Sequence, residues 1–340
     1  MFDPATAGVI VACILVFLLI TGTHIGVGLG ISGFIGILIT INERAAFAQV
    51  ATVPFSTTNS FTLAVIPLFI LMGSLATQAG LTTDLYRAAY NWLGKISGGL
   101  AMATTLASAA FGAACGSTIV NAAVFTKMAM PEMTKFGYDK RLSAGCIAAS
   151  GTLASLIPPS ILMIIYAVIT EQSVARLLVA GLVPGFLSAA VYMLGIYIVA
   201  KARPDLAPIP NVTITKRERW ESLKGVWGIS FLFILVIGGI YMGFFVPTYA
   251  GAVGAFGAFM IVAAKRKLNG RLLVDTFKDA GITTSTIFII VIGGIIFARF
   301  LTYTGLVGDI SEWMIALNLS PIAYLIGFAT VSYTHLTLPT

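Results

Sequence analysis

Long stretches without a single charged residue constrain this chain more than any other feature. Five of them run for 29 to 40 residues each, between Asp3 and Glu43, Arg44 and Asp84, Lys95 and Lys127, Arg141 and Glu171, and Lys224 and Lys265. A helix needs about 20 apolar residues to cross the hydrocarbon core of a bilayer. Only 10% of the residues are charged, whereas a soluble domain has about 25%. The chain is therefore predicted to be an all-α protein that crosses a membrane several times.

The apolar segments predict where the chain crosses. We expect spans at 5–22, 24–41, 61–79, 142–170, 177–200, 226–246, 248–264 and 280–301. The segment 80–95 has the composition of an amphipathic helix lying along the membrane surface. The net charge of +7 fits Lys and Arg gathered in cytoplasmic loops, which makes nucleic-acid binding a poor explanation for the basic balance.

The segment 96–126 predicts a different structure. As one helix its 31 uncharged residues would be about 46 Å long, well beyond the ~30 Å of the hydrocarbon core. Its middle, from Phe111 to Thr118, is small and polar where a single span would be most apolar. A re-entrant helical hairpin with its tip at membrane depth fits this pattern, provided that the tip is buried in protein or lines a wet cavity.

A repeat divides the chain. A shift of 225 residues aligns spans with spans and brings the Gly-Leu-x-x-Asp of residues 80–84 onto that of residues 305–309. With the hairpin counted, the two copies start on opposite sides of the membrane, as inverted repeats of transporters do. We therefore divide the chain into a first repeat unit at 1–200, a cytoplasmic linker at 201–225, and an incomplete second unit at 226–330.

Two polar interruptions are the candidate binding site. The hairpin tip supplies Gly116, Ser117, Thr118 and Asn121, whose hydroxyl, amide and carbonyl oxygens can coordinate sodium without a buried full charge. The second interruption is 150–160, where Pro158 and Pro159 lack N–H groups and leave earlier carbonyls without helical partners. The candidates from this second segment are Gly151, Ala154, Ile157, Pro158, Pro159 and Ser160. A plain proline kink is the alternative for this segment, but two such breaks within 45 residues favour one shared site.

Other motifs give little evidence for a functional site. Residues 28–33 match the dinucleotide pattern GxGxxG but lie in a span without a βαβ context, so close helix packing explains them better. Arg299 falls near the outer end of its span and can snorkel to the interface. The cysteines are not spaced as a metal site or a disulfide framework.

The residues of these segments resemble a known family, the large permease (DctM-like) subunit of tripartite ATP-independent periplasmic (TRAP) transporters. The resemblance rests on 112–141 with its Met-Pro-Glu-Met run, 149–166 with Ile-Pro-Pro-Ser, 180–185 and 245–250. It implies an inverted-repeat elevator in the bacterial inner membrane that couples sodium to the uptake of a C4-dicarboxylate or another organic acid. The implied partners are a periplasmic binding protein and a small four-helix membrane subunit.

The resemblance also implies which residues hold the first sodium ion. Carried over to this sequence, the metal ligands are Ser117, Asn121, Ala154, Ile157 and Pro159, with Thr118 beside them and some of them acting through backbone carbonyls. Sodium is the coupling ion, and no other cofactor is implied. The chain departs from the family pattern at Cys115 and Thr118, where serines are usual, and at Ala154, where glycine is common.

Three alternatives are weighed against this assignment. A divalent-anion/sodium symporter of related elevator fold would work without a binding protein and carry a paired Ser-Asn-Thr signature at its tips. A membrane-embedded enzyme would need an intramembrane carboxylate pair, HExxH or a Ser–His couple, and no Asp or Glu lies deep in any span. An ion channel would not need two unlike halves.

The C-terminal end is expected to be foreign. Residues 331–340 are polar and contain proline where the repeat requires an apolar helix arm, which predicts a non-native tail. On this basis the second hairpin is expected to be missing, so that the chain would not transport by itself.

Overall fold

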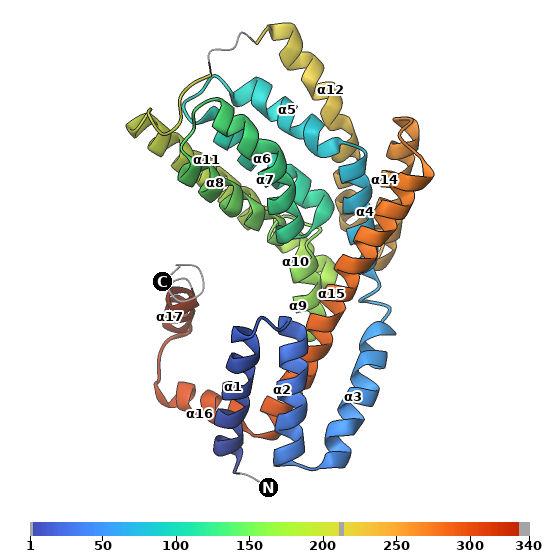
Figure 1. Ribbon diagram of the computed structural model, residues 1–340, viewed down its shortest axis with the longest axis vertical. Coiled ribbons are helices and arrows are strands. Elements are labelled where there is room, and N and C mark those ends of the chain that lie inside the picture. The colour runs from blue at the N-terminus through green and yellow to red at the C-terminus, as the bar shows by residue number, and fades with distance from the viewer. Residues whose placement is uncertain (1–2, 211–213, 333–340) are drawn as a thin grey trace. The chain divides into compact units, whose positions relative to one another are not determined.

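A computed structural model describes residues 3–210 and 214–332 (Figure 1), and this part of the chain contains helices and no strand. The chain divides into two compact units, each described by itself below. Unit 1 comprises Met1–Thr57 and Thr286–Thr340, and unit 2 comprises Thr58–Ser285. The predicted all-α polytopic membrane fold is confirmed by this helical architecture and its apolar helices.

Unit 1 is built from the two ends of the chain. Its elements are α1 (Pro4–Ile20), α2 (Ile25–Thr40), most of α3 (Glu43–Thr58), the second part of α15 (Gly270–Tyr303), α16 (Leu306–Ala316) and α17 (Pro321–Ser332). Its core joins α1, α2, α3 and α15 through Val11, Ile37, Ala46, Val53, Ile296 and Phe300.

Glycines set the distance between α2 and α15. A Cβ atom on Gly26 would lie 2.6 Å from the Ile289 carbonyl oxygen, and one on Gly33 would lie 2.7 Å from the Phe297 Cα. Gly28 faces α1 at ordinary contact distances of 3.7 Å or more. The GxGxxG motif is thus a helix-packing motif, as expected, and allows two backbones to approach closely.

Unit 2 holds the remaining helices. They are α4 (Val65–Gln78), α5 (Leu81–Leu93), α6 (Gly99–Cys115), α7 (Thr118–Lys135), α8 (Lys140–Thr152), η1 (Leu153–Ser155), α9 (Ile161–Ile169), α10 (Val174–Ala180), α11 (Leu182–Ala202), α12 (Lys216–Phe233), the π-helical η2 (Ile234–Gly238), α13 (Gly239–Tyr241), α14 (Pro247–Ala264) and the start of α15. Helix α4 packs along α14, and α6 lies against α5, α7, α8 and α11. Helix α6 is therefore the centre of this unit.

A sharp bend separates α4 from α5. The two helices meet at 63°, and Gly80 between them has a left-handed φ of 78°. Lys265, which follows α14, donates to the Asp84 carboxylate at 2.5 Å and so fixes the bend. Gly305, which lies 225 residues after Gly80, has a φ of 72° and starts α16 in the same way. Helix bends thus occur at both copies of the Gly-Leu-x-x-Asp sequence.

Several expected boundaries need correction. No expected span covers α3, whereas the break expected at 150–160 does divide 142–170, into α8 with η1 and α9. The expected span 177–200 is divided between α10 and α11, α12 begins at Lys216, and α15 begins ten residues before the expected 280. Within residues 3–210 and 214–332, four helical segments have the length and hydropathy of a membrane span, namely Val174–Ala202, Lys216–Tyr241, Pro247–Ala264 and Gly270–Tyr303, and the bent pair of α4 and α5 would be a fifth if it is one span.

The first two spans, the foreign tail and the division of the chain into repeat units stay predictions. Helices α1 and α2 are apolar but have 17 and 16 residues, which is short for a bilayer span of about 20. Most of the expected foreign tail lies outside the described residues, since α17 ends at Ser332. The division into 1–200, 201–225 and 226–330 remains a sequence-based prediction.

Candidate functional site

The helical hairpin is the first half of the candidate site. Helices α6 and α7 pack against each other and are joined by Gly116 and Ser117. Gly116 has a left-handed φ of 61°, and its N–H donates to the Gly112 carbonyl, so it ends α6. The Ser117 hydroxyl accepts from the Val120 N–H at 3.4 Å and so caps α7. Two helices joined by a turn lie where the hairpin of 96–126 is expected, with a second arm that continues to Lys135; its re-entrant position in the membrane stays a prediction.

The broken helix is the second half. Helix α8 and η1 end at Ser155, and α9 begins at Ile161. Pro158 and Pro159 have no N–H to give to carbonyls one turn earlier. The Ser160 hydroxyl replaces one of these bonds, because it donates to the Ser155 carbonyl at 2.7 Å. It also accepts from the Met163 N–H at 3.4 Å, so Ser160 links the two sides of the break.

The hairpin tip packs directly on this break. The Ile161 N–H donates to the Gly116 carbonyl at 3.2 Å. A Cβ atom on Gly116 would lie 2.5 Å from the Pro159 carbonyl oxygen. A side chain at position 116 would therefore be excluded both by its φ and by this contact. The two polar interruptions predicted from the sequence come together in space.

Small residues bring the arms of the hairpin close to the broken helix. A Cβ on Gly112 would lie 3.0 Å from the Ala154 Cα, and a Cβ on Gly151 would lie 2.9 Å from the Ala122 Cβ. Ala154 is fully buried in η1. Gly151 and Ala154 thus determine how closely the two polar segments approach.

A buried hydrogen-bond network lies beneath the tip. Asn121 has no exposed surface, and its Nδ2 donates to the Ser108 carbonyl at 3.0 Å. The Ser108 hydroxyl lies 3.2 Å from Asn121 Oδ1 and 2.9 Å from the Ser150 carbonyl oxygen. The hydroxyls of Ser150 and Thr105 lie 2.8 Å apart. The network ties α6, α7 and α8 together, and its hydrogen bonds satisfy polar atoms that could not face lipid.

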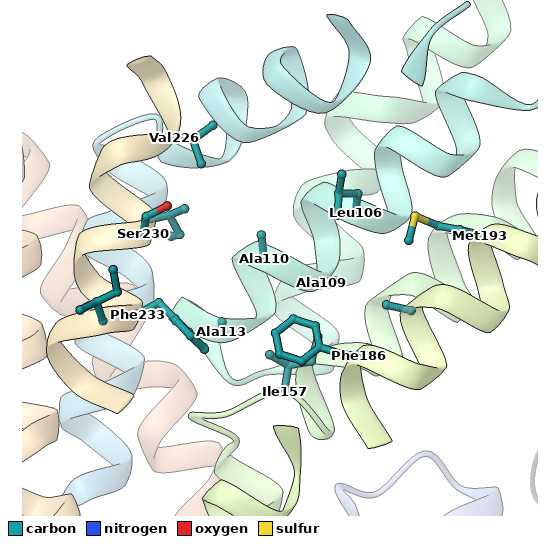
Figure 2. A pocket seen from close by; sticks show the side chains of 13 residues that line it. Leu106, Ala109, Ala110, Ala113, Ile157, Phe186, Met193, Val226, Ser230 and Phe233 are labelled. Atoms are coloured by element: carbon teal, nitrogen blue, oxygen red, sulfur yellow. The ribbon is translucent and has the colours of Figure 1, made fainter. Parts of the chain in front are cut away.

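The other expected residues differ in their surroundings. Thr118 is half-buried, and its hydroxyl makes no hydrogen bond within the described part of the chain. Pro158 and Pro159 are buried. The Ile157 side chain lines an apolar pocket of about 380 Å³ together with Ala113, Phe186 and Phe233 (Figure 2). Any polar contribution from Ile157 must therefore come from its backbone.

The sequence analysis missed Thr105 and Ser108. Both lie on α6, three residues apart and followed by Gly112 four residues later, so they share one helix face. A polar i, i+3 pair leading to a glycine in an otherwise apolar arm was the signal that could have found them. The partners of this face, Asn121 and Ser150, could only come from the tertiary structure.

The chemistry of the site is that of neutral oxygens. Its polar groups are hydroxyls, one carboxamide and backbone carbonyls, which suit a hard cation of low charge. Among residues 3–210 and 214–332, no group of three or more His, Cys, Asp or Glu side chains could hold a metal ion. The arrangement thus offers oxygen ligands without a charged side chain.

Comparison with known proteins shows the family to which the chain is related. Residues 12–333 match the family model of the tripartite ATP-independent periplasmic transporter, DctM component. The C4-dicarboxylate TRAP transporter large permease protein DctM of Pseudomonas aeruginosa is 35% identical over 301 residues, which are 88% of this chain and 69% of that protein. The ectoine/5-hydroxyectoine large permease UehC of Ruegeria pomeroyi is 31% identical, covering 85% and 67% of the two chains.

A third relative carries a different substrate name. The sialic acid TRAP transporter large permease protein SiaM of Vibrio cholerae is 28% identical over 79% of this chain and 62% of its own length. The relatives are transporter subunits and not enzymes, which confirms the expectation of transport and excludes the membrane-enzyme alternative. The chain is an integral membrane protein and belongs to the DctM family of TRAP transporter large permeases.

Proposed function

We propose that this chain is the large permease of a sodium-coupled importer of an organic acid in the bacterial inner membrane. A periplasmic binding protein delivers the acid, and a small four-helix membrane subunit works beside the permease. Support for the substrate class comes from relatives that are named for C4-dicarboxylates and sialic acid. The organisation with two further subunits follows the tripartite family to which the chain belongs.

The observation that carries the sodium proposal is the contact between the hairpin tip and the broken helix. Gly116 and Ile161 join the two segments through one hydrogen bond, so their free oxygens face a common region. We assign the cation to Ser117, Thr118 and Asn121 with the backbone carbonyls of residues 154, 157 and 159. The Ser117 hydroxyl and the Asn121 Oδ1 each accept one hydrogen bond and each keep a second lone pair for a ligand.

In this proposal the chain couples the two solutes through one mobile body. Sodium completes the junction of tip and broken helix and thereby shapes the acid site next to it. The body then crosses the membrane as an elevator. Without sodium the freed carbonyls of the break would face each other uncompensated, which disfavours binding of an anionic substrate at the same place.

Thr118→Val is the sharpest test, because its hydroxyl serves no hydrogen bond in the fold and valine keeps its shape. In vesicles that contain a complete version of this permease with its small subunit and binding protein, the half-saturating sodium concentration for uptake should rise about tenfold for each ~1.4 kcal/mol of lost ion binding. The thermal midpoint should stay unchanged. Ser117→Ala and Asn121→Ala should also raise the half-saturating sodium concentration, and both should in addition lower the thermal midpoint, because each removes a hydrogen bond of the fold.

Thr126→Val is the matched control. Thr126 lies on the same helix two turns further on, is exposed, and donates only to its own helix at the Ala122 carbonyl. Its replacement should leave the sodium dependence of uptake as it is. If Thr118→Val behaved like Thr126→Val, the assignment of the ion to the hairpin tip would be wrong. Uptake that is independent of sodium in the unaltered protein would refute the coupling itself.

A further inference from the structure

A groove runs between α8 and α11, and it shares no lining residue with the pocket of Figure 2. It has a volume of about 490 Å³. Its walls are apolar or small, and Thr105 and Ser150 at its floor already bond to each other. The lining residues are Thr105, Arg141, Leu142, Gly145, Cys146, Ala149, Ser150, Val191, Tyr192, Gly195, Ile196 and Val199.

The groove is long and has two unlike ends. It follows α8 from Arg141 to Ser150, a distance of nine helical rises or about 13.5 Å at 1.5 Å per residue. At one end the hydroxyls of Thr152 and Tyr192 lie 3.4 Å apart and join the two helices. At the other end α8 begins and α11 finishes, with Arg141 and Val199 in the lining.

Positive charge gathers at the second end. Arg141 is exposed and has no ion pair within the described part of the chain. Lys140 precedes it, and Lys201 and Arg203 follow Val199; all three are exposed. The nearby Asp139 forms no ion pair with Arg141 within the described residues; its Oδ1 accepts from the backbone N–H groups of residues 141 and 142 at 2.9 Å.

We propose that this groove binds an anionic phospholipid of the cytoplasmic leaflet. The phosphate pairs with Arg141 at the N-terminal end of α8, and one acyl chain lies along Gly145, Ala149 and Gly195. Charge complementarity supports this occupant, since basic pockets between membrane helices on the cytoplasmic side take anionic headgroups. The positive-inside rule assigns the loop before Arg141 to that side. The apolar length of the groove excludes a free phosphate or a small soluble acid as the natural occupant.

The pocket of Figure 2 serves as the internal comparison. It is also apolar, but none of its lining residues is charged. Nothing in that pocket selects a headgroup, so it offers no reason to prefer one lipid over another. The groove, in contrast, combines an apolar wall with a cation at one end. The proposal does not depend on sodium coupling.

Titration of the delipidated, purified chain with phosphatidylglycerol or phosphatidylcholine, followed by native mass spectrometry, tests the headgroup. We expect one phosphatidylglycerol to bind at least about fivefold more tightly than phosphatidylcholine, the preference that one surface cation gives. Arg141→Gln should remove the preference, whereas Lys224→Gln, which removes an exposed charge on α12, should keep it. Equal binding of the two lipids, or equal effects of the two variants, would overturn the proposal.

A second pair of variants tests the acyl chain. A Cβ on Gly195 would meet nothing within 4 Å, so Gly195→Leu fills the groove without strain and should abolish phosphatidylglycerol binding. Gly281→Leu on α15, where a Cβ also meets nothing within 4 Å, should retain it. Retention in Gly195→Leu would overturn the proposal. So would loss of bound lipid when the small subunit is added, because that subunit would then be the occupant.

Discussion

Two close helix contacts in this molecule use glycine, but they differ in what accompanies it. Between α2 and α15 of unit 1, Gly26 and Gly33 face the backbone of residues 289 and 297 with apolar side chains around them. Between the hairpin and α8 of unit 2, Gly112 and Gly151 bring the backbones together, and the hydroxyls of Ser108 and Thr105 bond across the contact to Ser150. The first contact needs only a good fit, whereas the second also needs partners for its polar atoms.

This difference predicts which kind of substitution should destabilise each contact. In a bilayer, apolar surfaces have no hydrophobic reason to prefer each other over lipid, so the first contact relies on van der Waals packing. The second contact also relies on hydrogen bonds, which keep buried polar atoms away from hydrocarbon. Added volume should therefore damage unit 1 most, and lost hydrogen bonds should damage unit 2 most.

The largest effect is expected from Gly33→Ala. Its Cβ would lie 2.7 Å from the Phe297 Cα, and backbone cannot move aside as a flexible side chain can. We expect a loss of about 1–3 kcal/mol, the usual cost of overpacking, measured as a lower midpoint of thermal unfolding in detergent. Gly28→Ala is the control in the same motif, because its Cβ meets only side chains at 3.7 Å or more. A similar loss in both variants would contradict the packing explanation.

Asn121→Ala tests the polar contact. It removes both Asn121 hydrogen bonds between α7 and α6 and leaves the Ser108 hydroxyl bonded to the Ser150 carbonyl alone, with an expected loss of about 1–2 kcal/mol from interhelical bonds in a membrane protein. Thr126→Ala, on the same helix but bonded only to its own backbone, should change the unfolding midpoint little. The comparison between the two contacts fails if Asn121→Ala is as mild as Thr126→Ala.

The smallest effect is expected where unit 1 does contain a polar contact. The Arg299 guanidinium donates to Gln49 Oε1, and Gln49 Nε2 donates to the Tyr303 hydroxyl at 3.4 Å. Arg299 is only half-buried and can snorkel to the interface. Arg299→Gln should therefore lower the stability by no more than about 0.6 kcal/mol, the average for such bonds. A midpoint shift as large as that of Gly33→Ala would show that polar contacts also dominate unit 1.

Composition and spacing predicted much of the fold. Charge-free gaps predicted the apolar helices, the small polar centre of 96–126 predicted the hairpin, and the proline pair predicted the break in 142–170. Helix α3 was missed because Glu43, Arg44 and Gln49 at its start and Pro54 within it resemble a loop. The extra length of α15 was missed because its first turns carry the charges of Arg271, Asp275 and Lys278, which end an apolar segment but do not end a helix.

The sequence predicted which segments form the site but not the hydrogen bonds between them. The residues of the tip and of the break follow from their unusual composition, since glycine, serine and proline are out of place in a span. The pairing of Ser108 with Asn121 and of Thr105 with Ser150 depends on how α6 packs on α7 and α8. Helical spacing places residues on a face, but it does not specify which residues of another helix that face will meet.

The bonds that join the hairpin to the broken helix also limit how fast the hairpin could swing away as a flap. To open, the tip would have to break the Ile161–Gly116 bond, and α6 would have to break the bonds of Ser108 and Thr105 to Ser150. Each broken bond would leave a polar atom in an apolar setting at the top of the barrier, and the rate falls tenfold for each ~1.4 kcal/mol added there. Hairpin and broken helix should accordingly behave as one rigid wall, with any rapid opening confined to another part of the transporter.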